Sequence, residues 1–145
     1  MSSVLLTVHV VAALLTLGPV AVAGSMFPKP ARALVADPDD QGARAVARVL
    51  HRICHVYSII SLAVPTFGTA LAFEIGALDE AWLLVSIGLT AVAAGILAFG
   101  VLPEQREVLR GNGTERSPRK LAALVGLFNL VWVVVAVLMV VQPGV

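Results

Sequence analysis

Residues 121–145 read LAALVGLFNLVWVVVAVLMVVQPGV and contain no Asp, Glu, Lys or Arg. Residues 1–28, 53–73 and 81–103 share this property, so four charge-free runs hold 97 of the 145 residues. All 19 charged side chains lie in the other 48 residues. About 20 helical residues cross a hydrocarbon layer about 30 Å thick. We therefore predict an all-α fold with four transmembrane helices, over about residues 3–24, 38–73, 80–102 and 118–142.

The composition argues against a soluble globular domain. Charged residues make up 13% of the chain and the mean hydropathy is +0.94, whereas soluble domains carry about 25% charged residues. A nucleic-acid-binding protein would present a basic face on a folded soluble part, so we expect no nucleic acid partner. The single cysteine, Cys54, has no second cysteine to pair with, and we expect a buried, unreactive thiol. Residues 1–145 are predicted to form one transmembrane domain.

The distribution of Lys and Arg predicts the topology. Five of the ten basic residues lie between the first and second runs, and the other five lie between the third and fourth. The loop between the second and third runs carries Glu74, Asp79 and Glu80 and no basic residue. Cytoplasmic loops retain Lys and Arg. We therefore expect a multi-pass protein of the inner (plasma) membrane, with both termini external and loops 25–52 and 103–120 cytoplasmic.

The helix predicted over residues 38–73 is longer than the membrane. It would measure about 54 Å at 1.5 Å per residue, so roughly its first 15 residues should project as a cytoplasmic stalk. Asp37 is the expected N-cap, and Pro38 suits the first helical position. Pro65 predicts a kink inside the membrane. The first run resembles a secretory signal at residues 21–24. Its apolar stretch is too long for a signal, however, and no basic residue precedes it. We therefore expect a spanning helix that ends at residues 27–30.

Histidines and arginines share one face of the helix predicted over residues 38–73. His51 and His55 are four residues apart, so their rings can meet, and such a pair can supply two ligands of a metal ion. The alternative is a basic interfacial surface. In that interpretation Arg44, Arg48 and Arg52 dock on anionic lipid headgroups or on a partner protein.

Two polar residues lie within the other charge-free runs. His9 is expected either to pack by hydrogen bonding to a neighbouring helix or to act as an axial haem ligand or proton relay. Asn129 lies near the bilayer centre, where an amide most often bonds across helices. Small residues allow close helix approach in lipid, so Gly88, Gly95 and Gly126 are predicted helix-packing positions together with Asn129.

The order of several short motifs resembles a known family. The motifs are LTVHV at 6–10, LGP at 17–19, VP at 64–65, FGTALA at 67–72, WLL at 82–84 and LPEQR at 102–106. Over about residues 4–110 the chain resembles the small bacterial integral membrane proteins grouped as domain of unknown function 2269. That resemblance implies a four-helix membrane fold and carries no established activity.

A more distant similarity is to the copper-resistance D type and the haem-binding protoporphyrinogen oxidase J type membrane proteins. The oxidase type has a histidine haem ligand in its first helix, and His9 occupies the matching position. The resemblance therefore implies His9 as a ligand of haem b. The basic residue that the oxidase type also uses within an early helix has no counterpart in this sequence.

These observations favour a four-helix antiparallel bundle without a catalytic site. We expect an accessory, scaffold or assembly subunit of a larger membrane complex, such as a respiratory one, that contacts the lipid bilayer and other membrane subunits or itself. No cofactor is required by this interpretation. The alternative is a haem- or metal-binding redox protein that uses His9. A small transporter is the third option, and no carboxylate lies within the four runs to couple transport to protons.

Overall fold

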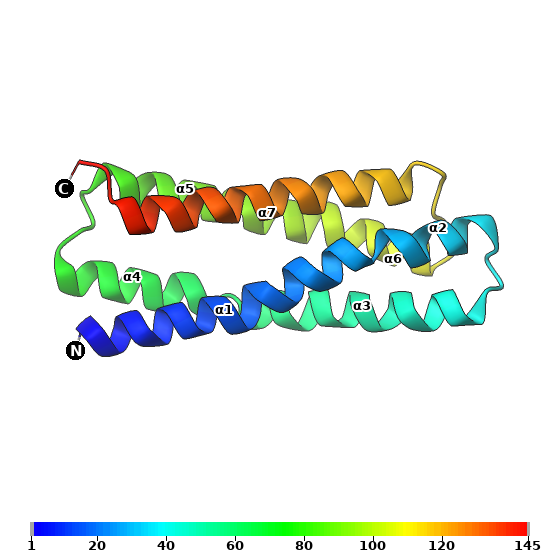
Figure 1. Cartoon of the computed structure of the whole chain (residues 1–145), viewed down its shortest axis with the longest axis horizontal. Coiled ribbons are helices and arrows are strands. Elements are labelled where there is room, and N and C mark those ends of the chain that lie inside the picture. Colours follow the sequence, from blue (N-terminus) through cyan, green and yellow to red (C-terminus); the bar gives the residue numbers. More distant parts are fainter. Residues whose placement is uncertain (1, 145) are drawn as a thin grey trace.

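The computed structural model describes residues 2–144, and these form four helical rods without strands (Figure 1). Each rod contains a helix long and apolar enough to cross a membrane. The predicted multi-pass, all-α fold is therefore confirmed. In chain order the elements are α1 (Ser2–Met26), α2 (Pro28–Ala36), α3 (Gln41–Ile60), α4 (Ala63–Ile75), α5 (Ala81–Gly95), the π-helical segment η1 (Ile96–Val101), α6 (Leu102–Leu109) and α7 (Ser117–Val141).

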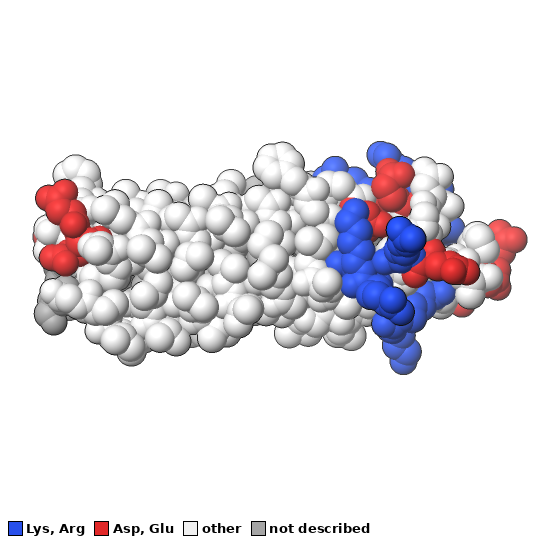
Figure 2. Space-filling view, turned by 90° about the horizontal axis from the view of Figure 1, so that it is seen from above, with Lys and Arg blue, Asp and Glu red and all other residues white. Residues whose placement is uncertain are grey.

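The rods run antiparallel. The start of α1, the end of α7 and the turn between α4 and α5 lie at one end of the molecule, and the loops after α2 and α6 lie at the other (Figure 1). All ten Lys and Arg side chains belong to residues 29–120 outside the charge-free runs, and they gather at the end that carries these two loops (Figure 2). We call this the basic end. A broad uncharged zone separates it from the few acidic residues at the opposite end (Figure 2).

The first rod is longer than the sequence predicted. Residues 27–30 do not close the helix, because the chain turns at Phe27 and continues as α2 to Ala36. Pro28 and Pro30 fall in the first turn of α2, where a missing N–H removes no intrahelical bond. The Ala31 backbone N–H donates to the Phe27 carbonyl at 3.1 Å, so hydrogen bonding continues past the prolines.

The second rod is interrupted rather than continuous over 38–73. Its N-cap is Asp40, whose side chain accepts from the Ala43 N–H at 3.0 Å, instead of the predicted Asp37. The break falls between α3 and α4. Because Pro65 has no N–H, the Ser61 carbonyl loses its usual partner, and it accepts from the Val64 N–H at 2.9 Å in a tighter turn.

The third rod continues beyond its predicted end at Leu102. It passes through η1, where the Leu102 N–H donates to the carbonyl of Leu97 five residues earlier, and then runs on as α6 to Leu109. A π turn accommodates one more residue than an α turn. The extra residue rotates the following helix by about 100° relative to a continuous α-helix, and this rotation carries Gln105 and Val108 into the core.

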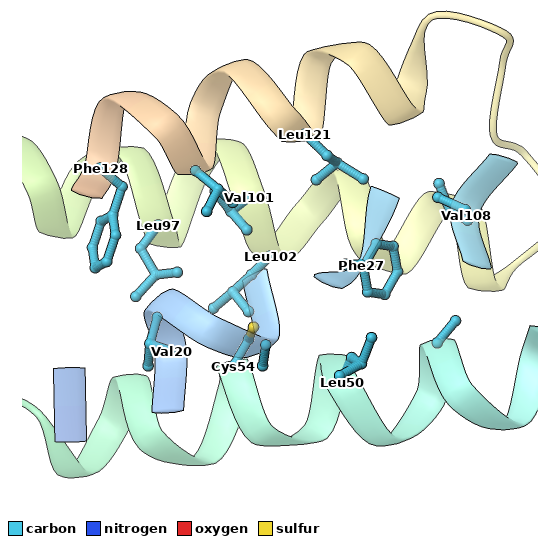
Figure 3. Packing of buried hydrophobic residues seen from close by; sticks show 14 of the residues in the cluster. Val20, Phe27, Leu50, Cys54, Leu97, Val101, Leu102, Val108, Leu121 and Phe128 are labelled. Carbon is cyan, nitrogen blue, oxygen red and sulfur yellow. The ribbon is translucent and has the colours of Figure 1, made fainter. Parts of the chain in front are cut away.

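The predicted stalk does not stand alone. The first half of α3 packs against α2 and α6, so three rods extend together beyond the apolar zone. Figure 3 shows the core that joins them, with Phe27, Leu50, Leu102, Val108 and Leu121 projecting into one space. Nearer the chain termini, α1 pairs with α4, and α5 pairs with α7.

Candidate functional site

His9 is buried on α1 and contacts α4. Its Nδ1 lies 2.9 Å from the backbone carbonyl oxygen of Val64. A carbonyl can only accept, so this bond requires the proton on Nδ1. In the neutral ring Nε2 is then the unprotonated nitrogen. The expected bond from His9 to a neighbouring helix is present.

Gly68 makes the approach of His9 to α4 possible. A Cβ atom at Gly68 would lie 2.8 Å from Cε1 and 3.1 Å from Nδ1 of the imidazole ring. Carbon atoms in proteins do not approach so closely, and any residue larger than glycine would displace the ring. Gly68 was part of the sequence motif FGTALA, but nothing in that motif indicated which residue faces it.

A second set of polar contacts connects α3 to α6 at the basic end. Nδ1 of His51 lies 2.8 Å from Oε1 of Gln105, and Nε2 of Gln105 lies 3.6 Å from Sγ of Cys54. Gln105 and Cys54 are fully buried. We call His51, Cys54 and Gln105 the buried polar network. The sequence alone indicated no role for Gln105, because the inward rotation caused by η1 has no sequence signature.

The predicted metal pair, His51 and His55, has its rings side by side. Their centroids are 6.2 Å apart and the ring planes differ by 29°. Nδ1 of His51 is occupied by Gln105, and Nδ1 of His55 is buried without a hydrogen-bond partner among residues 2–144. Within the same range no three His, Cys, Asp or Glu side chains are grouped as metal ligands. Metal binding by this pair stays a prediction.

Asn129 connects α7 to α1. Its side-chain Nδ2 lies 3.4 Å from Oγ of Ser25, a long hydrogen bond. The Ser25 hydroxyl donates to the Ala21 carbonyl at 2.7 Å, so its oxygen is free to accept from the amide. The contact matches the predicted cross-helix role.

The predicted packing glycines face away from the other helices. A Cβ atom at Gly88, Gly95 or Gly126 would meet nothing within 4 Å. Close approaches inside the bundle occur instead at Gly24, where Cγ2 of Val125 would be 3.1 Å from a Cβ, and at Gly100. The structure thus places no close contact at Gly88, Gly95 or Gly126 within residues 2–144, where these glycines were expected to bring helices of the bundle together.

The three arginines predicted to dock do not share one role. Arg44 donates to the backbone carbonyls of Leu109 and Pro38, so it closes the C-terminal end of α6. Arg48 and Arg52 are exposed. Neither belongs to the two salt bridges found among residues 2–144, which join Arg110 to Glu107 and Lys120 to Glu104.

Glu104 fastens α6 to the start of α7. Its Oε1 accepts from the Ser117 hydroxyl at 2.7 Å, and its Oε2 accepts from Nζ of Lys120 at 2.7 Å. The Ser117 oxygen also accepts from the Thr114 N–H at 2.9 Å. The loop between the third and fourth rods is thereby closed, and this contact was not foreseen from the sequence.

Comparisons of the chain with protein-family models, with curated proteins and with solved structures found no match. The resemblance to domain of unknown function 2269 and to the copper-resistance D and oxidase J types therefore stays an expectation. Any functional assignment depends on the contacts described above.

Proposed function

We propose that this membrane protein is a non-catalytic accessory or assembly subunit, held in the inner membrane with its basic end in the cytoplasm. The observation that supports this most is how the polar side chains between the two ends are used. His9 and Asn129 bond to neighbouring helices of the same chain. The hydroxyls of Thr16 and Ser86 donate to carbonyls four residues earlier. Each of these groups has its hydrogen-bond partner within the chain, two of them on a neighbouring helix and two on their own.

Three buried side-chain polar atoms among residues 2–144 lack a partner: the indole nitrogens of Trp82 and Trp132 inside the bundle, and Nδ1 of His55 nearer the basic end. An indole N–H is a donor only and supplies neither a base nor a nucleophile. The outward faces of the bundle, by contrast, offer small residues. Gly88 and Gly126 leave room where another helix can approach closely, which is how helices associate in lipid.

Gly126→Leu is expected to weaken lateral assembly without weakening the fold. A Cβ atom at this position meets nothing within 4 Å among residues 2–144, whereas a leucine side chain would block a partner helix. The measurement is the size of the tagged protein after mild extraction from its native membrane, together with its melting temperature. We expect the wild type to migrate as a larger complex and Gly126→Leu as the single chain with an unchanged melting temperature.

Gly24→Leu is the matched control, because a Cβ there already lies 3.1 Å from Val125. We expect this variant to lower the melting temperature. A wild-type protein that migrates as a single chain would contradict the assembly proposal, as would a Gly126→Leu protein that keeps the full complex. Gly88→Leu repeats the test on α5.

The second candidate function is haem binding through His9, and the bond to Val64 favours it. Ligating histidines commonly donate one ring N–H to a backbone carbonyl, which fixes the ring and directs the other nitrogen to the metal. Val64 holds His9 in this way, with Nε2 as the nitrogen available to a metal. No second axial ligand is identified.

On this alternative, the purified protein is expected to show a Soret band and a reduced-minus-oxidised difference spectrum, and His9→Ala should remove both. His55→Ala is the control and should leave the spectrum unchanged, since His55 lies on α3 and His9 bonds to α4. A colourless preparation, or a spectrum that survives His9→Ala, would defeat the haem proposal.

A further inference from the structure

Two arginines on the outer face of α3 lack a partner in the part of the chain that the structure describes. Arg48 and Arg52 are one helical turn apart and exposed. Neither guanidinium belongs to a hydrogen bond or salt bridge found among residues 2–144, whereas Arg44, one turn earlier, is held by two carbonyls. Two adjacent unpaired guanidinium groups favour an anionic ligand, and the planar donor fork of arginine suits a phosphate.

The exposed surface of α3 beside these arginines is apolar. It is a shallow, open patch formed by Ala45, Val46, Val49 and Leu50 of the same helix. Val46 and Val49 are 49% and 58% exposed. At about 100° per residue, Ala45 and Val49 point within about 60° of Arg52 around the helix. A ligand held by the arginines would therefore have an apolar surface next to it.

The depth of this surface matches lipid headgroups. Counting about 20 residues for the hydrocarbon layer, the apolar part of the second rod extends from Ile75 to about residue 55. Arg52 and Arg48 then lie about 5 and 10 Å beyond it, within the headgroup region of a bilayer. Figure 2 shows the same order, with the basic side chains starting where the uncharged zone ends.

The apolar face continues from Val49 into the membrane. Val56, Ile59 and Ile60 are exposed on the same side of α3 as Val49, so an acyl chain could follow the helix downward from a bound phosphate. A soluble acidic partner would use the arginines but not this continuous apolar face.

We propose that Arg48 and Arg52, with the exposed apolar face of α3 that descends from them, bind an anionic phospholipid of the cytoplasmic leaflet. The two guanidinium groups hold the phosphate, and Val56 and Ile60, which lie deeper along the helix, contact the upper acyl chain. This inference rests on the proposed orientation of the basic end but not on the proposed assembly, because the glycine positions tested there lie on α5 and α7.

The test is binding of phosphatidylglycerol to the purified full-length protein, measured by native mass spectrometry, with phosphatidylcholine as the uncharged comparison. Basic residues near a membrane surface contribute roughly equal free energies to binding anionic lipid, and removing two should weaken it about 30-fold. We expect this loss for Arg48→Gln/Arg52→Gln, with phosphatidylcholine binding unchanged. Arg48→Lys/Arg52→Lys should retain most of the affinity, because the charge is kept.

Arg116→Gln/Arg119→Gln is the matched control, since it removes two exposed charges from the same end of the molecule. The proposal predicts little change in phosphatidylglycerol binding for this pair. An equal loss in both double variants would show general surface attraction and overturn the proposal. Full competition by soluble glycerol phosphate would also overturn it, because the ligand would then need no acyl chain. The melting temperature of each variant in phosphatidylcholine checks that the fold is retained.

Discussion

Phe27→Ala is expected to lower the free energy of unfolding by about 3–5 kcal/mol, the usual cost of removing a buried aromatic side chain. Phe27 is 0% exposed and lies at the turn between α1 and α2. Figure 3 shows its ring among Leu50, Leu121 and Val108, which belong to three other helices. Truncation would leave a cavity that four helices share, and none can close it alone.

The measurement for Phe27→Ala is reversible unfolding of the detergent-solubilised protein, followed by tryptophan fluorescence. Met26→Ala is the control, because the neighbouring Met26 side chain is 54% exposed and its removal should change stability little. Equal stability of the two variants would mean that the core at the basic end is not packed as described.

Gln105→Ala is expected to cost about 2–4 kcal/mol, from a cavity and from a lost hydrogen bond. The amide is fully buried and bonds His51 on one side and Cys54 on the other. Without Gln105, Nδ1 of the half-buried His51 would lose its hydrogen-bond partner. A partly buried polar group that is left unpaired adds some of its desolvation cost to the value of the lost bond.

Gln105→Leu separates the two contributions, because it fills most of the space but cannot hydrogen-bond. We expect about 1–3 kcal/mol of destabilisation for this variant. A double-mutant cycle of Gln105→Leu with His51→Phe then measures the pair directly. The two changes should be non-additive, with a coupling of about 0.5–3 kcal/mol. Simple additivity would show that His51 and Gln105 do not stabilise one another.

The four rods and their antiparallel order followed from the charge-free runs, because a hydrocarbon layer tolerates neither charge nor unpaired backbone. The residues at which the rods begin and end were predicted less well from the sequence. Pro28 and Pro30 suggested a stop, although prolines are equally compatible with the first turn of a new helix. The wide turn of η1 arises because backbone N–H groups bond to carbonyls five residues earlier instead of four. No residue type in this segment determines which of the two carbonyls accepts.

The polar contacts, too, were predicted only in part from the sequence. The sequence indicated that His9 and Asn129 would bond across helices, since polar groups in lipid need partners. It could not identify Val64 or Ser25 as the partners, because that depends on which helix faces which and in what register. The outward direction of Gly88 and Gly126 was missed for the same reason. Small residues mark a helix face but do not say whether its neighbour belongs to the same chain.

The wide turn of η1 also restricts how the length of this chain can vary. Deleting one residue between 96 and 101 would restore an ordinary α turn and swing α6 back by about 100°. Gln105 would then lose its hydrogen bond to His51, and Val108 would turn out of the core. A substitution among the apolar side chains of this segment has no such consequence. The number of residues here, more than their identity, aligns the two halves of the third rod.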